Sequence, residues 1–168
     1  MGNPNDSDCR LSPGLYIRQG DEIVEAPEED VVVAKAYPEW PDKGPVIDGL
    51  RLTIMTKKKT YPIDEEVRVI HVLEATMPGR KVHIMGPKEV FGEYVDGQLQ
   101  GADIAADQRD AFTSLEYDGR VLDSPATDFN YEITTYFFTN PGIHRICWQP
   151  GRWKSNTLEI EVLECVEA

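Results

Sequence analysis

The chain contains three histidines, His71, His83 and His144, which are the first candidates for acid–base chemistry or metal binding. Each lies among apolar residues in a strand-like segment, where a histidine more often has a structural role than a catalytic one. A metal site formed by His71 and His83 would require their strands to pair in a suitable register, which the sequence does not show. We therefore predict structural histidines and no bound metal.

The cysteines are three in number, Cys9, Cys147 and Cys165. An odd count without regular spacing argues against a disulfide framework and against a zinc site. Cys147 lies within a strand pattern and is predicted to be a small buried hydrophobic residue. Cys9 and Cys165 lie near the two termini, which often approach each other in a domain. A disulfide between them is therefore one possibility if the protein is exported.

Motifs of nucleophilic catalysis and phosphate binding are missing from the chain. It has no Gly-x-Ser-x-Gly sequence, no Walker motif and no Gly-x-Gly-x-x-Gly sequence. A glycosidase needs two carboxylates across a cleft, but among 30 acidic residues no pair stands out. We expect that the protein is not an enzyme and that it has no cofactor.

The run VDGQLQGADIAAD invites comparison with the calcium loop of EF-hands. Asp96 would be the first ligand, Gly101 the required glycine and Asp107 the twelfth position. Glutamines stand where that loop has Asp or Asn, and Asp103 stands where it has an apolar residue. Two interpretations stay open, a looser oxygen site that uses Asp96, Asp103 or Asp107, and a solvated loop.

A tryptophan lies between two cations in the run ICWQPGRWKSNTLEI, residues 146–160. Gln-Pro-Gly is good turn chemistry, so the run predicts two strands joined by a loop. In one interpretation Trp153 folds back over the end of the fold, with Arg152 or Lys154 stacked on its ring. In the other, the loop binds a partner, since Trp and Arg often dominate binding energy. The candidate binding residues are Arg152, Trp153 and Lys154.

The elements that would position these residues are short strands with alternating apolar and polar residues. Leu50, Leu52 and Ile54 share one face of a predicted strand. Residues 67–72 carry apolar side chains on both faces, which predicts a central or covered strand. Further strand patterns cover 82–84, 131–138, 143–149 and 157–163.

The first 45 residues predict an extra N-terminal layer of β structure. Residues 1–10 are polar and are expected to be flexible. Residues 11–45 read as a β segment, with a hairpin about Gly20 and a β-branched run at 31–33, followed by a proline-rich crossing.

Residues 46–168 form the predicted sandwich, with a long acidic excursion at 91–130. An excursion of this length is expected to contain short elements or to have a function. Within it, residues 102–112 could form about two turns of helix, the one short helix that we expect. The fold class is therefore all-β, an antiparallel sandwich or barrel.

The tail NPGIHRICWQPGRWKSNTLEIEV resembles the last two strands of immunoglobulin-like and fibronectin III-like domains, and YPIDEEVRVIHVLEA resembles the entry to their second strand. The resemblance covers roughly residues 46–168 with a gap at 91–130 and implies an antiparallel immunoglobulin-like β-sandwich. Two positions depart from these folds. His144 stands where they often have a corner tyrosine, and Cys147 lacks the partner for an inter-sheet disulfide.

Composition limits the classes of partner. Hydrophobic residues make up 40% of the chain, and the net charge is −13. The electrostatic field of a chain with this negative charge repels phosphate backbones and anionic membranes. The single basic run, residues 57–59, is short and lies beside a turn. No stretch predicts a membrane helix or a signal peptide. The expected compartment is the cytoplasm if Met1 is the natural start, and extracellular if a signal was removed.

We predict a non-enzymatic β-sandwich module that recognises another protein through the loops at one end. One alternative is a protease inhibitor that inserts loops into a cleft. Another is an adhesion domain that depends on calcium or carbohydrate, for which exposed aromatic residues must lie beside oxygen ligands.

Overall fold

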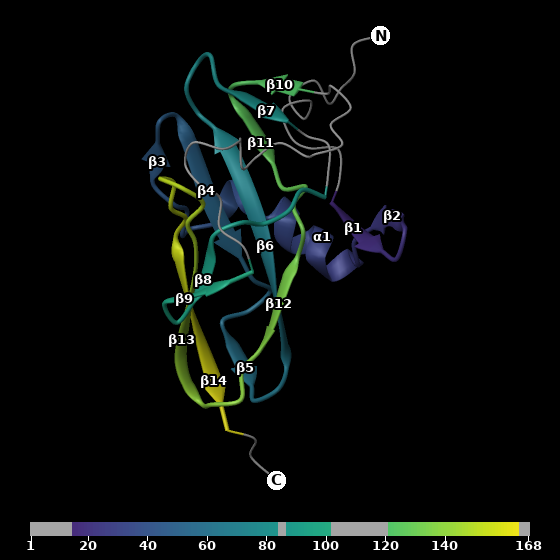
Figure 1. Ribbon diagram of the computed structural model, residues 1–168, viewed down its shortest axis with the longest axis vertical. Helices are drawn as coiled ribbons and strands as arrows, with labels where there is room; N and C mark the ends of the chain where they lie inside the picture. Colours follow the sequence, from purple (N-terminus) through teal and green to yellow (C-terminus); the bar gives the residue numbers. More distant parts are fainter. Residues whose placement is uncertain (1–14, 84–86, 102–120, 165–168) are drawn as a thin grey trace.

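The computed structural model describes residues 15–83, 87–101 and 121–164 (Figure 1). These residues form mostly β-strands, which confirms the all-β class. Their helical elements are one α-helix, α1 (Glu28–Lys35), and one short 3-10 helix, η2 (Tyr37–Glu39). The predicted flexible terminus, the helix predicted at 102–112, and Cys9 and Cys165 lie outside the described residues.

Two sheets of five strands pack face to face. The first sheet contains β3 (Val46–Ile47), β4 (Leu50–Met55), β6 (Glu66–Ala75), β11 (Ala126–Asp128) and β12 (Thr134–Phe137). Its central strand β6 pairs with β4 on one side, and with β11 and β12 on the other, all antiparallel. The second sheet has the order β5 (Thr60–Pro62), β14 (Thr157–Leu163), β13 (Gly142–Trp148), β8 (Glu93–Val95), β9 (Gln98–Gln100). Only β5 pairs in parallel within it.

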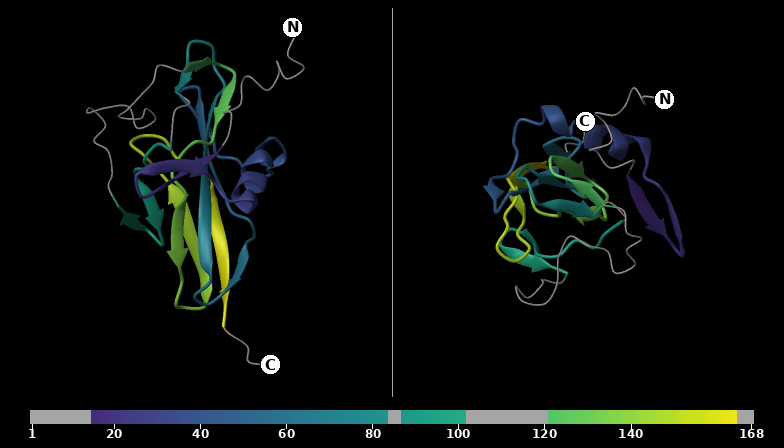
Figure 2. Two further views of the ribbon diagram at one scale, coloured as in Figure 1. Left: turned by 90° about the vertical axis from the view of Figure 1, so that its right-hand side faces the viewer. Right: turned by 90° about the horizontal axis from the view of Figure 1, so that it is seen from above.

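Two small ribbons complete the described strands. β1 (Tyr16–Gln19) pairs with β2 (Glu22–Glu25), which confirms the hairpin predicted about Gly20. This ribbon projects from the side of the molecule beyond α1 (Figure 2). β7 (Lys81–His83) pairs with β10 (Val121–Asp123). The acidic excursion therefore contains short strands at both ends, as its length predicted.

The side chains of β4 and β6 that point into the core are those that the alternation in the sequence predicts. Leu50, Leu52 and Ile54 of β4 point into the core between the sheets. On β6, Val67 and Val69 point into that core, while the opposite face of the strand contributes to a second apolar cluster under α1. β6 is therefore covered on both faces, as predicted, because the sandwich lies on one side and the N-terminal segment on the other.

The strand predicted at residues 31–33 is wrong, because Val31, Val32 and Val33 belong to α1. Acidic residues fill the first turn of this helix and Lys35 its last turn, which suits the helix dipole. Packing of α1 on β6 outweighs the β-propensity of three valines. The N-terminal layer is therefore a β-ribbon and a helix, and not β structure throughout.

Candidate functional site

The β13–β14 hairpin presents the predicted binding residues, and its loop is anchored at both ends. The strand bounds agree with the predicted 143–149 and 157–163 to within a residue or two. The Gln149 N–H donates to the Gly92 carbonyl at 2.7 Å, and the Ser155 N–H donates to the Trp148 carbonyl at 2.8 Å. A Cβ atom at Gly92, where φ is +73°, would lie 2.5 Å from the Gln149 oxygen, so this approach requires glycine.

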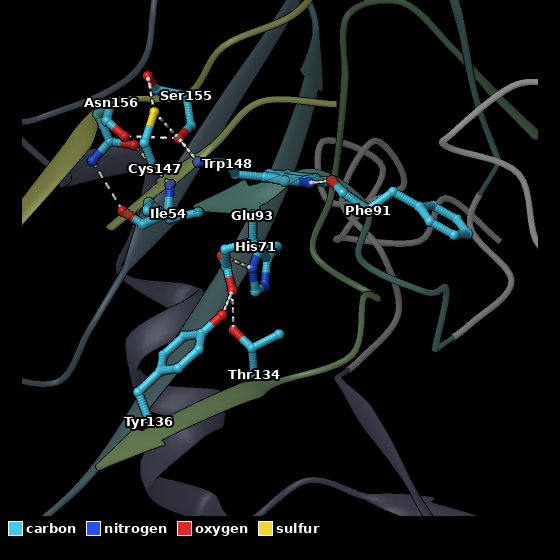
Figure 3. A network of polar contacts seen from close by, with 10 residues as sticks. All are labelled: Ile54, His71, Phe91, Glu93, Thr134, Tyr136, Cys147, Trp148, Ser155 and Asn156. Carbon is cyan, nitrogen blue, oxygen red and sulfur yellow. Dashed lines mark hydrogen bonds and ion pairs between the residues drawn. The ribbon is translucent and has the colours of Figure 1, made fainter. Parts of the chain in front are cut away.

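Asn156 joins the base of this loop to the opposite sheet. Its side chain accepts from the Ile54 N–H at 2.7 Å and donates to the Ile54 carbonyl at 3.0 Å. The backbone N–H and carbonyl of Ile54 are thus both hydrogen-bonded to one buried side-chain amide, as they would be to the backbone of a neighbouring strand. These two hydrogen bonds tie the base of the loop to β4 (Figure 3).

Trp153 folds back against the sandwich. Its ring is half-buried on the core, and its Nε1 donates to the Ile47 carbonyl at 3.0 Å. The Arg152 guanidinium lies 4.8 Å from the centre of the Trp153 ring and 2.9 Å from an Asp48 oxygen. The packing interpretation therefore describes the position of Trp153, and Arg152 and Lys154 are the exposed members of the predicted site.

Apolar side chains accompany these cations at the same end of the sandwich. Val46 and Met77 are 44% and 51% exposed. Val46 belongs to the strand next to Asp48, and Met77 packs against Gly49 in the β3–β4 turn. We call Val46, Asp48, Met77, Arg152, Trp153 and Lys154 the tip surface.

A buried polar cluster surrounds His71 between the two sheets (Figure 3). His71 Nε2 lies 2.6 Å from Glu93 Oε2, and neither side chain is more than 1% exposed. The Thr134 hydroxyl donates to Glu93 Oε1 at 2.5 Å, and the Tyr136 hydroxyl donates to the same oxygen. The His71 ring also meets the edge of Trp148, with ring centres 5.0 Å apart.

The environment of Glu93 favours its charged form. Burial would raise the pKa of Glu93, but the charge and hydrogen bond of His71, with the two hydroxyls, outweigh it and hold this pKa below its ordinary value. The cluster is closed to solvent, so it has the character of a structural centre. Sequence reasoning identified His71 but missed Glu93, since one acid among many carries no local signal.

His144 forms a second, more accessible polar pair. Its Nδ1 donates to Asp96 Oδ2 at 2.6 Å and its Nε2 donates to the Asn140 carbonyl at 2.7 Å. Since both ring nitrogens face acceptors, these contacts favour the imidazolium form of the ring. Burial lowers the pKa of His144, but the hydrogen bonds and the charge of Asp96 outweigh it and raise this pKa.

Of the candidate calcium and metal ligands, those that the structure describes do not come together. The carboxylate of Asp96 is occupied by His144 and by the Arg145 N–H at 2.8 Å. Asp103 and Asp107 lie outside the described residues. His83 lies on β7, which pairs with β10 and not with the strand of His71. Across residues 15–83, 87–101 and 121–164, no group of three or more His, Cys, Asp or Glu side chains is placed to hold a metal ion.

Charged side chains line a pocket of about 260 Å³ beside α1. Asp30 of α1 accepts hydrogen bonds from both Nε and NH2 of Arg68 on β6. The basic run 57–59 is exposed, and two of its lysines form ion pairs, Lys57 with Glu29 and Lys58 with Glu65. Both acids and cations line this pocket and several of them pair with one another, so it favours neither sign of ligand.

Comparison with known proteins found no matching family model, no matching curated protein and no matching solved structure. In the part of the chain that the structure describes, no helix has the length and apolar character needed to span a membrane. Function must therefore be inferred from the residues themselves.

Proposed function

We propose that the chain is a non-enzymatic, immunoglobulin-like β-sandwich module that binds another protein through the tip surface. The observation that carries this proposal is the Arg152 side chain, which is 65% exposed while its guanidinium lies over the Trp153 ring in the β13–β14 loop. A cation presented in this way loses little conformational freedom on binding.

The strand order supports the immunoglobulin-like assignment. In such domains strands A, B and E are neighbours in one sheet, and strands C, F and G are neighbours in the other. Here β4, β6 and β12 follow one another in the first sheet, and β8, β13 and β14 in the second. Assigned in chain order, these strands take the places of A, B, E and C, F, G.

The sequence departs from immunoglobulin-like domains at His144 and Cys147, and other contacts take the place of the usual ones. A corner tyrosine bonds back to the backbone a few residues upstream, and His144 makes such a bond to the Asn140 carbonyl. In place of an inter-sheet disulfide, His71 of β6 meets Trp148 of β13 across the core. Both substitutions are compatible with the same fold.

The chemistry of the tip surface suits a protein partner with a carboxylate beside an apolar group. Within the tip surface, Arg152 and Lys154 outnumber Asp48, which favours an acidic side chain of the partner although the whole chain is strongly acidic. Trp153, Val46 and Met77 offer apolar area next to the cations. Arginine binds carboxylates in a planar, bidentate geometry, which would set the orientation of the partner.

The placement of the histidines supports a module without catalysis. His71 is closed to solvent by the two sheets and is paired with Glu93. His144 uses both ring nitrogens for contacts within the chain. Neither ring, so placed, is available to a substrate as a general base.

Affinity capture from the source organism, in lysate and in culture medium, tests this proposal. The wild type is compared with Arg152→Ala/Lys154→Ala, which leaves the packed Trp153 in place. Arg145→Ala is the matched control, since Arg145 is 61% exposed and pairs with Glu159 on another face. All three proteins must first be shown to melt alike.

We expect one protein to be retained by the wild type and the control, and lost with the double variant. Reconstitution with that purified protein should then give a dissociation constant at least tenfold weaker for the double variant, or about 1.4 kcal/mol. Equal retention by all three proteins would remove the tip surface as the site.

A further inference from the structure

Lys88 and Asp128 form a second buried pair, which neither the tip surface nor the His71 cluster involves. Lys88 Nζ lies 2.5 Å from Asp128 Oδ2, and the two side chains are 1% and 0% exposed. Asp128 ends β11, and Lys88 lies just before β8, forming an isolated parallel bridge with Tyr131. The pair therefore joins an edge of the first sheet to the segment that crosses to the second.

Two aromatic rings lie beside this pair. Lys88 Nζ lies 4.5 Å from the centre of the Tyr131 ring, and that ring packs on Trp148 with centres 5.2 Å apart. The backbone N–H of Asn130 donates to the other Asp128 oxygen, Oδ1, at 3.1 Å. One carboxylate oxygen thus faces the amine, and the other faces a fixed hydrogen-bond donor.

Removal from water favours the neutral amine of Lys88 over its ammonium form. Burial lowers the pKa of Lys88, although the charge and hydrogen bond of Asp128 oppose this effect. Transfer of one proton from the ammonium to the carboxylate gives an amine next to a carboxylic acid. An amine in that state has a free electron pair and can attack a carbonyl carbon.

We propose that Lys88 and Asp128 become joined by an amide bond between Nζ and Cγ. The new Nζ–Cγ bond forms and the Cγ–Oδ2 bond breaks. Oδ2 leaves with two protons of the pair as one molecule of water, so no oxidant, reductant or other reactant is needed. The product is a neutral isopeptide cross-link that removes the buried charges.

The contacts assign a role to each oxygen of Asp128. Oδ1 becomes negative while the tetrahedral intermediate exists, and the Asn130 N–H is already directed at it. Oδ2, which contacts Nζ, is positioned to take up protons and depart. Burial then limits the access of water to the finished amide.

The cross-link would join residues 40 positions apart in the chain. Like a disulfide, it would limit the freedom of the unfolded chain, and unlike a disulfide it would resist reduction. It would fix β11 to the crossing segment near the centre of the sandwich. This cross-link is independent of the proposed binding function.

Intact mass spectrometry of the folded, then denatured, wild-type protein tests the proposal. We expect a mass lower by one water than that of the sequence. The variants Lys88→Met and Asp128→Ala should each have the full mass of their own sequences. The wild-type measurement decides the matter by itself, so the result does not depend on whether either variant folds.

Tryptic mapping locates the lost water. We expect no cleavage after Lys88, and a branched peptide that joins residues 82–109 to residues 121–145. Lys58 is the matched control, since it lies 2.6 Å from Glu65 but is 44% exposed, and trypsin should cleave after it normally. A full wild-type mass, or normal cleavage after Lys88, would overturn the proposal.

Loss of water at an Asp-Gly sequence by succinimide formation would give the same intact mass and must be distinguished. Such a loss would map to Asp48, Asp96 or Asp118, leave Lys88 cleavable and reverse in mild base. That outcome would also overturn the cross-link. A branched peptide that survives mild base supports it.

Discussion

His71 on β6 and Glu93 on β8 face each other across the core, with 2.6 Å between Nε2 and Oε2. They connect the two sheets at a depth that solvent does not reach. Two hydroxyls from β12 complete the coordination of the carboxylate. A polar contact of this kind stabilises the sandwich only while every member is present.

Replacement of the acid, Glu93→Leu, should lower the free energy of unfolding by about 3–5 kcal/mol, because it leaves a buried histidine and two hydroxyls without their acceptor. Urea unfolding gives this value directly. Glu161→Leu, at an exposed position of β14, is the control and should change the same quantity by less than about 0.5 kcal/mol. The double variant His71→Phe/Glu93→Leu should be more stable than Glu93→Leu alone. Equal stability of Glu93→Leu and wild type would contradict a structural role for the cluster.

The His144–Asp96 pair should make stability depend on pH. The pKa of His144 is raised in the folded protein, so its contribution is complete below the unfolded value of about 6.5 and is lost as pH rises through the folded value. Burial would raise the pKa of Asp96, but the hydrogen bonds and charges of His144 and Arg145 outweigh burial and lower this pKa. The contribution of Asp96 is therefore present above about pH 4 and is lost as pH falls through the folded value.

The variant His144→Gln should therefore be less stable than wild type by up to about 1 kcal/mol near pH 5, and this difference should shrink toward pH 9 and toward pH 2. Chemical unfolding of both proteins at each pH measures it. A constant difference across the whole range would show that the charge of the ring makes no contribution.

Trp153 and Arg152 should affect stability to different extents. Trp153→Phe removes the hydrogen bond to the Ile47 carbonyl and some packing, so we expect a loss of about 1–2 kcal/mol. Arg152→Ala removes only an exposed ion pair and a stacked cation, so the loss should stay below about 1 kcal/mol. Thermal melting of both variants, with Lys154→Ala as the exposed control, measures which of the two substitutions lowers stability more. A larger loss from Arg152→Ala than from Trp153→Phe would contradict the geometry.

Asn156→Ala should lower the free energy of unfolding by about 2–4 kcal/mol, because the N–H and the carbonyl of Ile54 both lose their partner inside the protein. Asn156→Asp should not restore stability, since it removes the donor and places a charge near Asp42, whose oxygen lies 3.3 Å from the amide nitrogen. Hydrogen exchange at the Ile54 amide reports the same change locally. Thr157→Ala, at an exposed position next to it, is the control, and unchanged exchange at Ile54 in Asn156→Ala would show that another group holds β4.

Local patterns in the sequence predicted the strands of the sandwich well. Alternation along β4 and β14, and apolar residues on both faces of β6, indicated which side chains enter the core. Such patterns depend on neighbours two residues apart, so they are visible without the fold. The same local reasoning failed at Val31–Val33, where packing of α1 on β6 decides between helix and strand.

The amino-acid sequence by itself determined the all-β class and the β13–β14 hairpin. Tertiary structure alone decided which polar groups meet, since Glu93, Asp128 and Asn156 have partners 22, 40 and 102 residues away. Trp153 shows the same division, because its turn is encoded locally but its acceptor, Ile47, comes from another sheet. A buried polar contact depends on the geometry between sheets, and no periodicity along one strand records that geometry.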